Sequence, residues 1–482
     1  MTDRALTDSG QDPDRRQCHD RDVGDEAVAE RGSTGDAVVI GAGMAGLAAA
    51  RVLADRFARV TVVDRDHLPS GPESRRGVPQ SAHPHALLAV GRDALEKLFP
   101  GLTDELVGLG ARWIDVARDA YVWQLDGYRV RVDSGVTMLA VSRPLLESCV
   151  QRRVRALPGV RVLDDTAVAG LVGRSGERVS GVTLADGREL AAELVVDASG
   201  RGSRSDRWLR ELDFPVPAES VITVRVHYTT QLVRGQPDCL PGSGMIVVAE
   251  TPPEQCRYGA AFSVEGGRWL VTLGGFHGEQ APTDPEGFRR FADDLPDGTI
   301  AQLLRTGEPL TDPVAYTYPA SRRRHFERLR RIPAGYVAMG DALCSFNPVY
   351  GHGMTVAALE AVTLGESLDR HRTPGVVMAR DFYRRSAKVI AVAWDMAAAT
   401  DFVYPGTEGP RPRGLALTHW YQRRIFRALH VSPEVIRTVV RVQHLLEPGS
   451  ALLRPAMVVR VLRAARRDRK AVGSAAARRP IL

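Results

Sequence analysis

The hydrophobic positions between residues 37 and 64 predict a strand, a helix and a second strand. Residues 37–40 and 60–64 are short, nearly continuous apolar runs, and residues 44–56 repeat apolar side chains at helical spacing. Apolar runs bounded by glycine are typical of strands buried on both faces, as in parallel sheets. The pattern therefore indicates a βαβ unit near the start of the chain.

The segment after this unit mixes helical and strand periodicity. Helices are expected over 81–99 and 144–156, the second with Ser142 as its cap. The expected short strands are 160–163, 168–172, 179–184 and 189–196. Asp186-Gly187 separates the last two, and because Asp-Gly is favoured in tight turns, the pair is predicted to form a hairpin.

From about residue 215 to residue 278 the pattern changes to longer alternating strands. The expected strands are 221–229, 245–249, 258–264 and 269–275. Alternation of this kind is typical of antiparallel strands that pack one face on a core. A block of such strands between glycine-rich segments indicates a separate substrate-binding domain. It is followed by a strand at 336–339, a helix over 354–368 and a helical region beyond 376.

Composition narrows the class of protein. The chain has 482 residues, of which 44% are hydrophobic and 25% charged, which is ordinary for a soluble protein of two or more domains. Its five cysteines are scattered without metal-ligand spacing, so we expect a reduced, cytoplasmic protein with no metal site. Residues 1–35 lack the apolar stretch of a signal peptide and predict a disordered leader. No apolar run is long enough to span a bilayer.

The net charge of +6 is unevenly distributed. Residues 411–482 hold sixteen Arg and Lys against three Asp and Glu, so the rest of the chain is net acidic. Aromatic residues are not interleaved with these arginines, which argues against nucleic-acid binding. Residues 451–465 combine apolar residues and arginines in a pattern that fits two structures. One is a helix packed on the protein with a solvated basic face, which we favour, and the other is a peripheral membrane contact.

The turn after the first strand has the form of a dinucleotide-binding motif. Gly41, Gly43 and Gly46 are spaced as G-x-G-x-x-G. The first glycine permits the tight turn, the second lets a pyrophosphate approach the backbone, and the third allows close helix packing. Asp64 closes the second strand, where a carboxylate can accept hydrogen bonds from ribose hydroxyls. A strand, a helix and an acid in this order favour dinucleotide binding over a structural turn.

Two later segments have the character of cofactor-binding loops. A strand ending at Asp197 is followed by small residues up to Gly200, which allows the backbone to lie close to a ligand. Residues 340–354 follow another strand and end in a Gly-x-Gly loop that opens a helix. There Asp341 can bind a ribityl chain, and the helix dipole can stabilise an anionic reduced flavin by about 1 kcal/mol. Taken alone, either segment is also compatible with a polar loop or a helix cap.

Taken together, the three segments resemble those of the FAD-dependent monooxygenases of the para-hydroxybenzoate hydroxylase type. The resemblance extends over about residues 36–370. Residues 76–80 (Arg-Gly-Val-Pro-Gln), 142–147 (Ser-Arg-Pro-Leu-Leu-Glu) and 344–348 (Cys-Ser-Phe-Asn-Pro), with His83 and His85, resemble the bacterial polyene epoxidases of polyether biosynthesis.

This resemblance implies an α/β fold. We expect a Rossmann-like FAD-binding domain of the glutathione-reductase type, an inserted and mainly antiparallel β-sheet substrate domain, and a helical C-terminal segment. The expected bounds are 36–205 and 326–375 for the FAD-binding domain, 206–325 for the substrate domain and 376–482 for the helical region.

The resemblance also implies the activity. It predicts a monooxygenase that transfers one oxygen atom of O2, through a flavin C4a-hydroperoxide, to an apolar polyene, terpenoid or aromatic substrate. Epoxidation of an alkene in secondary metabolism, such as antibiotic biosynthesis, is the specific expectation, and aromatic hydroxylation is the runner-up. The flavin carries this chemistry, so no catalytic side chain is expected. A geranylgeranyl-reductase-like flavoprotein and a non-catalytic flavin-binding protein are the alternatives.

Carried over to this sequence, the resemblance assigns roles to particular residues. Asp64 would bind the adenosine ribose, Arg143 the phosphates or the ribityl chain, and Val168 would lie near the adenine. Arg75 and Arg76 would either contact the pyrophosphate or belong to a solvated basic loop. The full set of expected cofactor-binding residues is Gly41, Gly43, Met44, Ala45, Gly46, Asp64, Arg65, Arg76, Arg143, Val168, Asp197, Gly200, Asp341, Pro348, Gly351, Gly353 and Met354.

The substrate pocket and the electron donor are less well marked. Candidate pocket residues are His83, Trp123, Tyr228, Phe262, Trp269 and Phe276, although residues of this kind are most often core. Aromatic hydroxylases carry Asp-Gly where this chain has Asp197-Ala198, and no second G-x-G-x-x-G is present for NADPH. Electrons are therefore expected either from NAD(P)H directly or through a separate flavin reductase. The Trp-x-Trp-x-Ile-Pro signature of flavin-dependent halogenases is also missing.

Overall fold

The N-terminal part of the chain forms a parallel sheet, as the hydrophobic pattern predicts. The structure is a computed structural model that describes residues 35–75, 77–235, 244–249, 251–253 and 255–472. The expected leader, apart from Gly35, and Arg76 lie outside the described residues. Five parallel strands lie in the order β17-β10-β1-β2-β6. Their bounds are β1 Asp36–Ile40, β2 Arg59–Val63, β6 Val160–Leu163, β10 Leu194–Asp197 and β17 Tyr336–Ala338.

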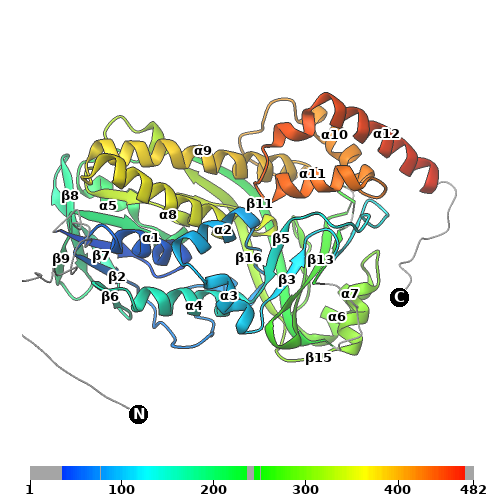
Figure 1. Cartoon of the computed structure of the whole chain (residues 1–482), viewed down its shortest axis with the longest axis horizontal. Coiled ribbons are helices and arrows are strands. Elements are labelled where there is room, and N and C mark those ends of the chain that lie inside the picture. The colour runs from blue at the N-terminus through cyan, green and yellow to red at the C-terminus, as the bar shows by residue number, and fades with distance from the viewer. Residues whose placement is uncertain (1–34, 76, 236–243, 250, 254, 473–482) are drawn as a thin grey trace, which may run out of the picture.

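Helices pack beside this sheet (Figure 1). Helix α1 (Met44–Ala54) follows β1 and packs against α8 (His352–His371). Helix α4 (Arg143–Arg155) begins where the sequence predicts, because the Ser142 hydroxyl accepts a hydrogen bond from the Leu145 N–H at 3.3 Å. The helix expected over 81–99 is shorter: α2 spans Ala89–Leu98, since Leu88 has an extended backbone. The remaining helices of this part are α3 (Leu102–Gly108) and α5 (Ser205–Glu211).

The strand expected over 189–196 is divided between two sheets. Its first half, β9 (Glu189–Ala191), pairs with β8 (Arg178–Leu184), which in turn pairs with β7 (Val168–Arg174). Its second half is β10 of the parallel sheet. The chain changes partner at Ala192 and Glu193, whose N–H groups donate to Ser180 and Asp36 respectively. The predicted hairpin at Asp186-Gly187 is therefore confirmed, but the single long strand is not.

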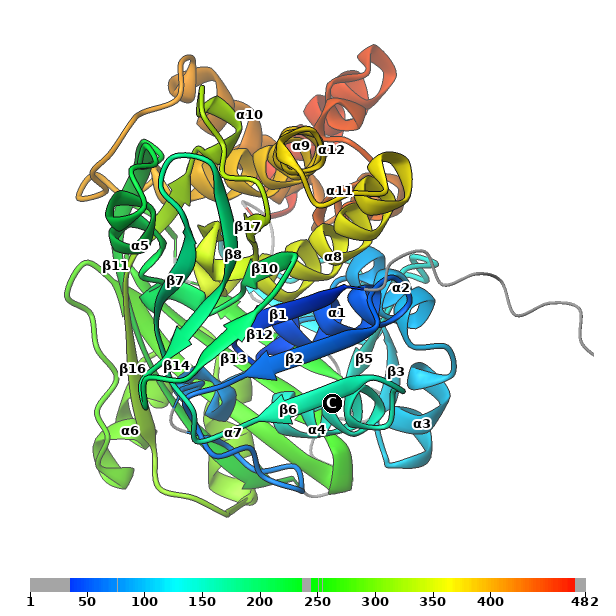
Figure 2. The same cartoon turned by 90° about the vertical axis from the view of Figure 1, so that its left-hand side faces the viewer.

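The second sheet has eight strands and is mainly antiparallel (Figure 2). Its order is β18-β16-β11-β14-β13-β12-β4, with β15 paired to β11. The four strands that the alternation predicts are β11 (Glu219–Arg234), β12 (Met245–Ala249), β13 (Arg257–Val264) and β14 (Arg268–Phe276). Those that it does not predict are β4 (Ala120–Gln124), β15 (Glu308–Pro309), β16 (Val314–Arg324) and β18 (Cys344–Ser345).

Strand β4 crosses the expected domain boundary. It comes from the segment 36–205 but pairs in parallel with β12 at the edge of the second sheet. The two-stranded sheet of β3 (Arg112–Asp115) and β5 (Thr137–Ala140) lies in the same part of the sequence. Helices α6 (Pro285–Asp293) and α7 (Thr299–Thr306) cover one face of the large sheet. The domain bounds remain a prediction, while the α/β class with an antiparallel insertion is confirmed.

The C-terminal region is helical, as predicted. Helix α9 (Val376–Asp401) packs along α8, and α10 (Leu415–Ala428), α11 (Pro433–Gln443) and α12 (Pro455–Val472) form a group at one end of the molecule (Figure 1). Val461 and Ala464 of α12 are buried with apolar residues of α10 and α11, whereas Arg460 and Arg463 are exposed. The basic helix is thus packed on the protein, and a membrane contact stays a prediction. None of the described helices is both long and apolar enough to cross a membrane.

Candidate active site

A cavity of about 580 Å³ lies where the carboxyl ends of β1, β2 and β10 approach the large sheet. This is the edge at which open parallel sheets bind their ligands. All three segments that the sequence singles out contribute to its wall. Among the expected cofactor-binding residues, those that line the cavity are Gly41, Gly43, Met44, Ala45, Asp64, Arg65, Arg143, Val168, Gly200, Asp341, Pro348, Gly351, Gly353 and Met354.

The glycine turn after β1 has the geometry that a pyrophosphate requires. Gly41 has a φ of 100°, which favours glycine. A Cβ at Gly46 would lie 1.8 Å from the Gly41 carbonyl oxygen, so only glycine allows α1 to pack this closely. A Cβ at Gly43 would meet only the Arg75 guanidinium, at 4.0 Å. The turn is therefore closed on its helix side and open on its cavity side, which fits the approach of a phosphate group.

Asp64 lies in a buried cluster of charges beside this turn. Its Oδ2 accepts a hydrogen bond from the Ala42 N–H at 2.6 Å and lies 3.3 Å from Nη1 of Arg75. Arg75 also pairs with Asp66 at 3.1 Å and with Glu147 at 3.1 Å, and Glu147 pairs with Arg143 at 2.8 Å. The cluster places two arginines next to the glycine turn, where they are paired with the carboxylates of Asp64, Asp66 and Glu147. A contact of Arg75 with a pyrophosphate stays a prediction.

The other end of the cavity is formed by Asp341 and the start of α8. Burial raises the pKa of Asp341, and the nearby Arg201 and Arg143 partly oppose this effect. Gly351 has a φ of 68° and precedes the first residue of α8. A Cβ at Gly353 would meet only Asp341 Oδ1, at 3.9 Å, so the backbone there is open to the cavity. The free N–H groups of a helix N-terminus favour negative charge in a ligand at this end.

Two buried acids that the sequence analysis missed support this loop. Glu360 of α8 accepts a hydrogen bond from the Gly340 N–H at 2.6 Å, and burial raises its pKa to about 8. Asp401 at the end of α9 accepts hydrogen bonds from Asn347 Nδ2 at 2.8 Å and from the Tyr350 hydroxyl at 2.7 Å. Asp401 is far from its partners in the sequence, and neither acid belongs to a local motif, so no sequence signal indicated them.

Two of the expected cofactor residues lie behind the cavity wall instead of in it. Gly46 faces the back of the glycine turn. Asp197 is fully buried, and its carboxylate accepts hydrogen bonds from Ser203, Ser205 and Tyr336. It therefore holds the second loop in place, and Gly200 and Arg201 of that loop reach the cavity. Arg76 lies outside the described residues.

The candidate pocket residues fall into two groups that the sheet separates. Tyr228 lines the cavity, together with Tyr316 and Tyr318. Trp269 is buried with Val271 under α6 and α7, and Trp123 packs against the same cluster. These two tryptophans lie on the opposite face of the large sheet, so the expectation that they line the pocket is wrong. Successive side chains of a strand point to opposite faces, and the alternation does not reveal which face meets the cofactor.

The other candidates, Phe262, Phe276 and His83, do not line the cavity. Phe262 and Phe276 share the face of Tyr228 by their register, and Phe276 stacks on Tyr404 with ring centroids 4.3 Å apart. His83 is buried behind Tyr228, and burial lowers its pKa to about 4, so it is neutral. Its neighbour His85 does line the cavity.

The fold and this cavity have the features of an FAD-dependent oxidoreductase. Residues 36–205 match the family described as FAD dependent oxidoreductase. The chain is 34% identical over 392 residues to Protein Rv3254 of Mycobacterium tuberculosis, an alignment that covers 78% of this chain and 82% of that protein. It therefore belongs to the same family as Protein Rv3254.

Proteins of known structure that share this fold are named for different reactions. The flavin-dependent brominase Bmp2 superposes with a TM-score of 0.62 at 15% identity, covering 91% of this chain and 100% of Bmp2. PqsL of P. aeruginosa, solved in complex with 2-aminobenzoylacetate, has a TM-score of 0.56 at 17% identity, covering 77% and 98%. The Diels-Alderase PyrE3 of pyrroindomycin biosynthesis has a TM-score of 0.60 at 18% identity, covering 86% and 81%. These similarities show the fold, while the reaction has to be argued from the site.

Proposed function

We propose that this protein is an FAD-dependent monooxygenase that inserts one oxygen atom of O2 into an organic substrate with a large apolar part. Epoxidation of an alkene in polyketide or terpenoid metabolism is the specific reaction, and aromatic hydroxylation is the second candidate. The supporting observation is that one cavity is lined both by the cofactor segments and by an aromatic face of the large sheet. A substrate on Tyr228 and Tyr316 would share this space with the flavin.

Different residues of the cavity would hold different parts of the cofactor. Arg75 and Arg143 would donate hydrogen bonds to the pyrophosphate beside Gly43, and Asp64 would bind the adenosine ribose. Asp341 and the N-terminus of α8 would hold the flavin end. When bound, FAD supplies the redox and oxygen-transfer chemistry.

The aromatic side chains that line the cavity would have a separate role, which is to exclude water from the reacting atoms. They include Phe346, Tyr228 and Tyr316. Electrons would come from NAD(P)H directly or through a separate flavin reductase. Although Bmp2 has the same fold, halogenation is disfavoured because the Trp-x-Trp-x-Ile-Pro signature is missing.

Oxygenation and reduction can be separated with one probe. Photoreduced, FAD-loaded protein is mixed with geranylgeraniol and isotopically labelled O2, and the product is analysed by mass spectrometry. We expect a product that gains one labelled oxygen atom. A product that gains two hydrogen atoms and no oxygen would identify a reductase instead. Photoreduced free FAD is the control, and the simple phenol 4-hydroxybenzoate, run in parallel, tests for aromatic hydroxylation.

A further inference from the structure

Three tyrosines form a continuous patch on the sheet face that lines the cavity. Tyr228 of β11 is directly opposite Tyr316 of β16, and Tyr318 is opposite Val226, so all three point the same way. The ring centroids of Tyr228 and Tyr316 are 5.5 Å apart. Tyr318 is 3% exposed, and its hydroxyl lies near the hydroxyls of Ser321 and Ser345 but makes no hydrogen bond of good geometry among the described residues. A buried hydroxyl without a partner costs about 1–3 kcal/mol, so it calls for an explanation.

Arg201 adds a cation to this patch. Its guanidinium lies 4.3 Å from the centroid of the Tyr318 ring and lines the cavity. Nη1 donates to the Ala320 carbonyl at 3.0 Å and to Ser345 Oγ at 3.3 Å. No carboxylate among the described residues lies within ion-pair distance of it, and its charge partly opposes the rise in the pKa of Asp341, which lines the same cavity. Arg201 therefore carries a positive charge into the cavity without a direct ion pair.

A second buried polar group lies immediately behind the tyrosines. The His83 ring is 4.8 Å from that of Tyr228 and 5.7 Å from that of Tyr316. Its Nδ1 lies 2.7 Å from Thr230 Oγ1, while Nε2 is buried without a partner in the described part of the chain. The unsatisfied groups thus gather on one side of the cavity. Arginine offers only donors and a tyrosine hydroxyl can donate, so an acceptor that carries negative charge is the ligand that complements them.

We propose that Arg201 and Tyr318, with Tyr228 and Tyr316 beside them, bind an oxyanion of the substrate, such as a carboxylate or an enolate. The substrate is then an amphipathic acid whose apolar part continues along the sheet face, and not a plain hydrocarbon. This inference rests on the proposed function only in placing the substrate in the same cavity as the flavin. A polar edge of the flavin could also supply the acceptor, so the test has to distinguish the two sources.

The test compares two polyenes that differ in their head group. All-trans-retinoic acid and retinol are titrated into the FAD-loaded protein, and binding is followed by quenching of tryptophan fluorescence. We expect the acid to bind at least tenfold more tightly, which corresponds to about 1.4 kcal/mol. Arg201→Met and Tyr318→Phe should each abolish most of this preference and leave the affinity for retinol unchanged. Arg188→Met, at an exposed arginine of the β8–β9 turn, is the matched control.

Three outcomes overturn the proposal. One is equal affinity for the two polyenes, and another is binding of neither. In the third, Arg201→Met weakens FAD binding but preserves the preference for the acid, which would assign these groups to the cofactor. Failure of the proposed function can be told apart from failure of this proposal. If the protein prefers retinoic acid but oxygenates no probe, the oxyanion subsite stands and only the proposed reaction is refuted.

Discussion

Replacing Asp401 with asparagine should change the stability of the protein in a pH-dependent way. Asp401 is fully buried at the end of α9, and its Oδ2 has no hydrogen-bond partner among the described residues. Its Oδ1 accepts both the Asn347 and the Tyr350 hydrogen bonds. Burial raises the pKa of this carboxyl from 3.8 to about 6, and the two hydrogen bonds only partly oppose the increase.

The sign of the effect follows from proton linkage. Between the unfolded and the folded pKa the folded state binds more protons, so the contribution of Asp401 to stability falls as pH rises through this interval. A pKa raised by this amount lowers the free energy of unfolding by about 3 kcal/mol at pH values above both the unfolded and the folded pKa. About half of this loss occurs between about pH 5 and about pH 8. Asparagine has no charge to bury and keeps an acceptor oxygen for Asn347 and Tyr350. The variant should therefore gain about 1.4 kcal/mol relative to wild type over that range.

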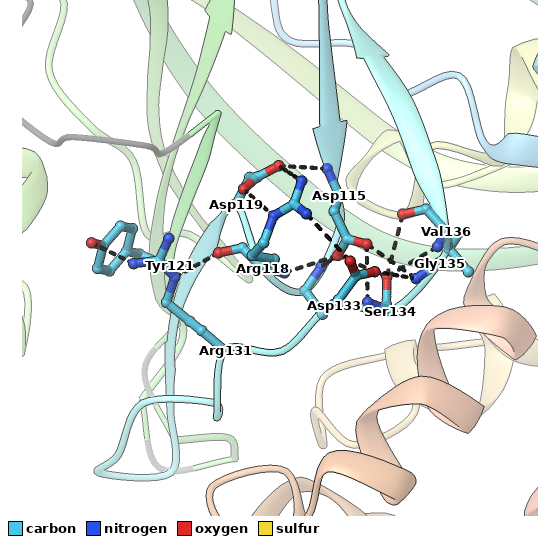
Figure 3. Close-up of polar contacts among 10 residues, drawn as sticks. Asp115, Arg118, Asp119, Tyr121, Arg131, Asp133, Ser134, Gly135 and Val136 are labelled. Carbon is cyan, nitrogen blue, oxygen red and sulfur yellow. Dashed lines mark hydrogen bonds and ion pairs between the residues drawn. The ribbon is translucent and has the colours of Figure 1, made fainter.

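Urea unfolding of both proteins at the two pH values measures this difference directly. Asp115→Asn is a matched control, because Asp115 is also buried but its pKa is lowered. Burial alone would raise that pKa, and the hydrogen bonds from the N–H groups of Arg118 and Ala117 and from Ser134 together outweigh it. Figure 3 shows the contacts of Asp115 with Arg118 and Ser134. Asp115 therefore stays ionised from pH 5 to 8, and its variant should lose the same stability at both values. A pH-independent difference for Asp401→Asn, or one of opposite sign, would refute the reasoning.

The remaining predictions concern the cofactor turn, a helix cap and the hidden face of the sheet. Asp64→Ala removes the expected acceptor for the ribose hydroxyls and leaves the Ala42 N–H without its acceptor. Because a hydrogen bond to a charged group contributes about 1.5–3 kcal/mol, the FAD dissociation constant should rise at least tenfold in a fluorescence titration. Unchanged affinity would show that Asp64 does not belong to the site. Ser142→Ala deletes the cap of α4 and should cost about 1 kcal/mol in urea unfolding, whereas Ser142→Thr should restore most of it. Trp269→Ala should cost about 3–5 kcal/mol of stability because it leaves a cavity in the core under α6 and α7. A change in retinoic acid affinity larger than that of Arg188→Met would contradict the position of Trp269 on the sheet face away from the cavity.

Much of the candidate cofactor site could be predicted because its signals are local. The spacing of Gly41, Gly43 and Gly46 encodes one tight turn, and Asp64 ends the strand next to it, so neighbours in sequence are neighbours in space. The segments at 197–204 and 340–354 follow strands of the same parallel sheet, and their carboxyl ends must therefore meet at one edge. Even Ser142 could be assigned, since a cap bond spans only three residues.

What the sequence by itself determined is thus the elements next to the three glycine-rich segments and the edge of the parallel sheet at which these segments meet. Only the tertiary structure decided which side chains meet there. It placed Tyr228 in the cavity and Trp269 behind it, because alternation separates two faces without naming them. It also brought Asp401 to Asn347 and β4 to β12, contacts between segments remote in sequence. Such pairings depend on how whole layers pack, and no short pattern of residues records them.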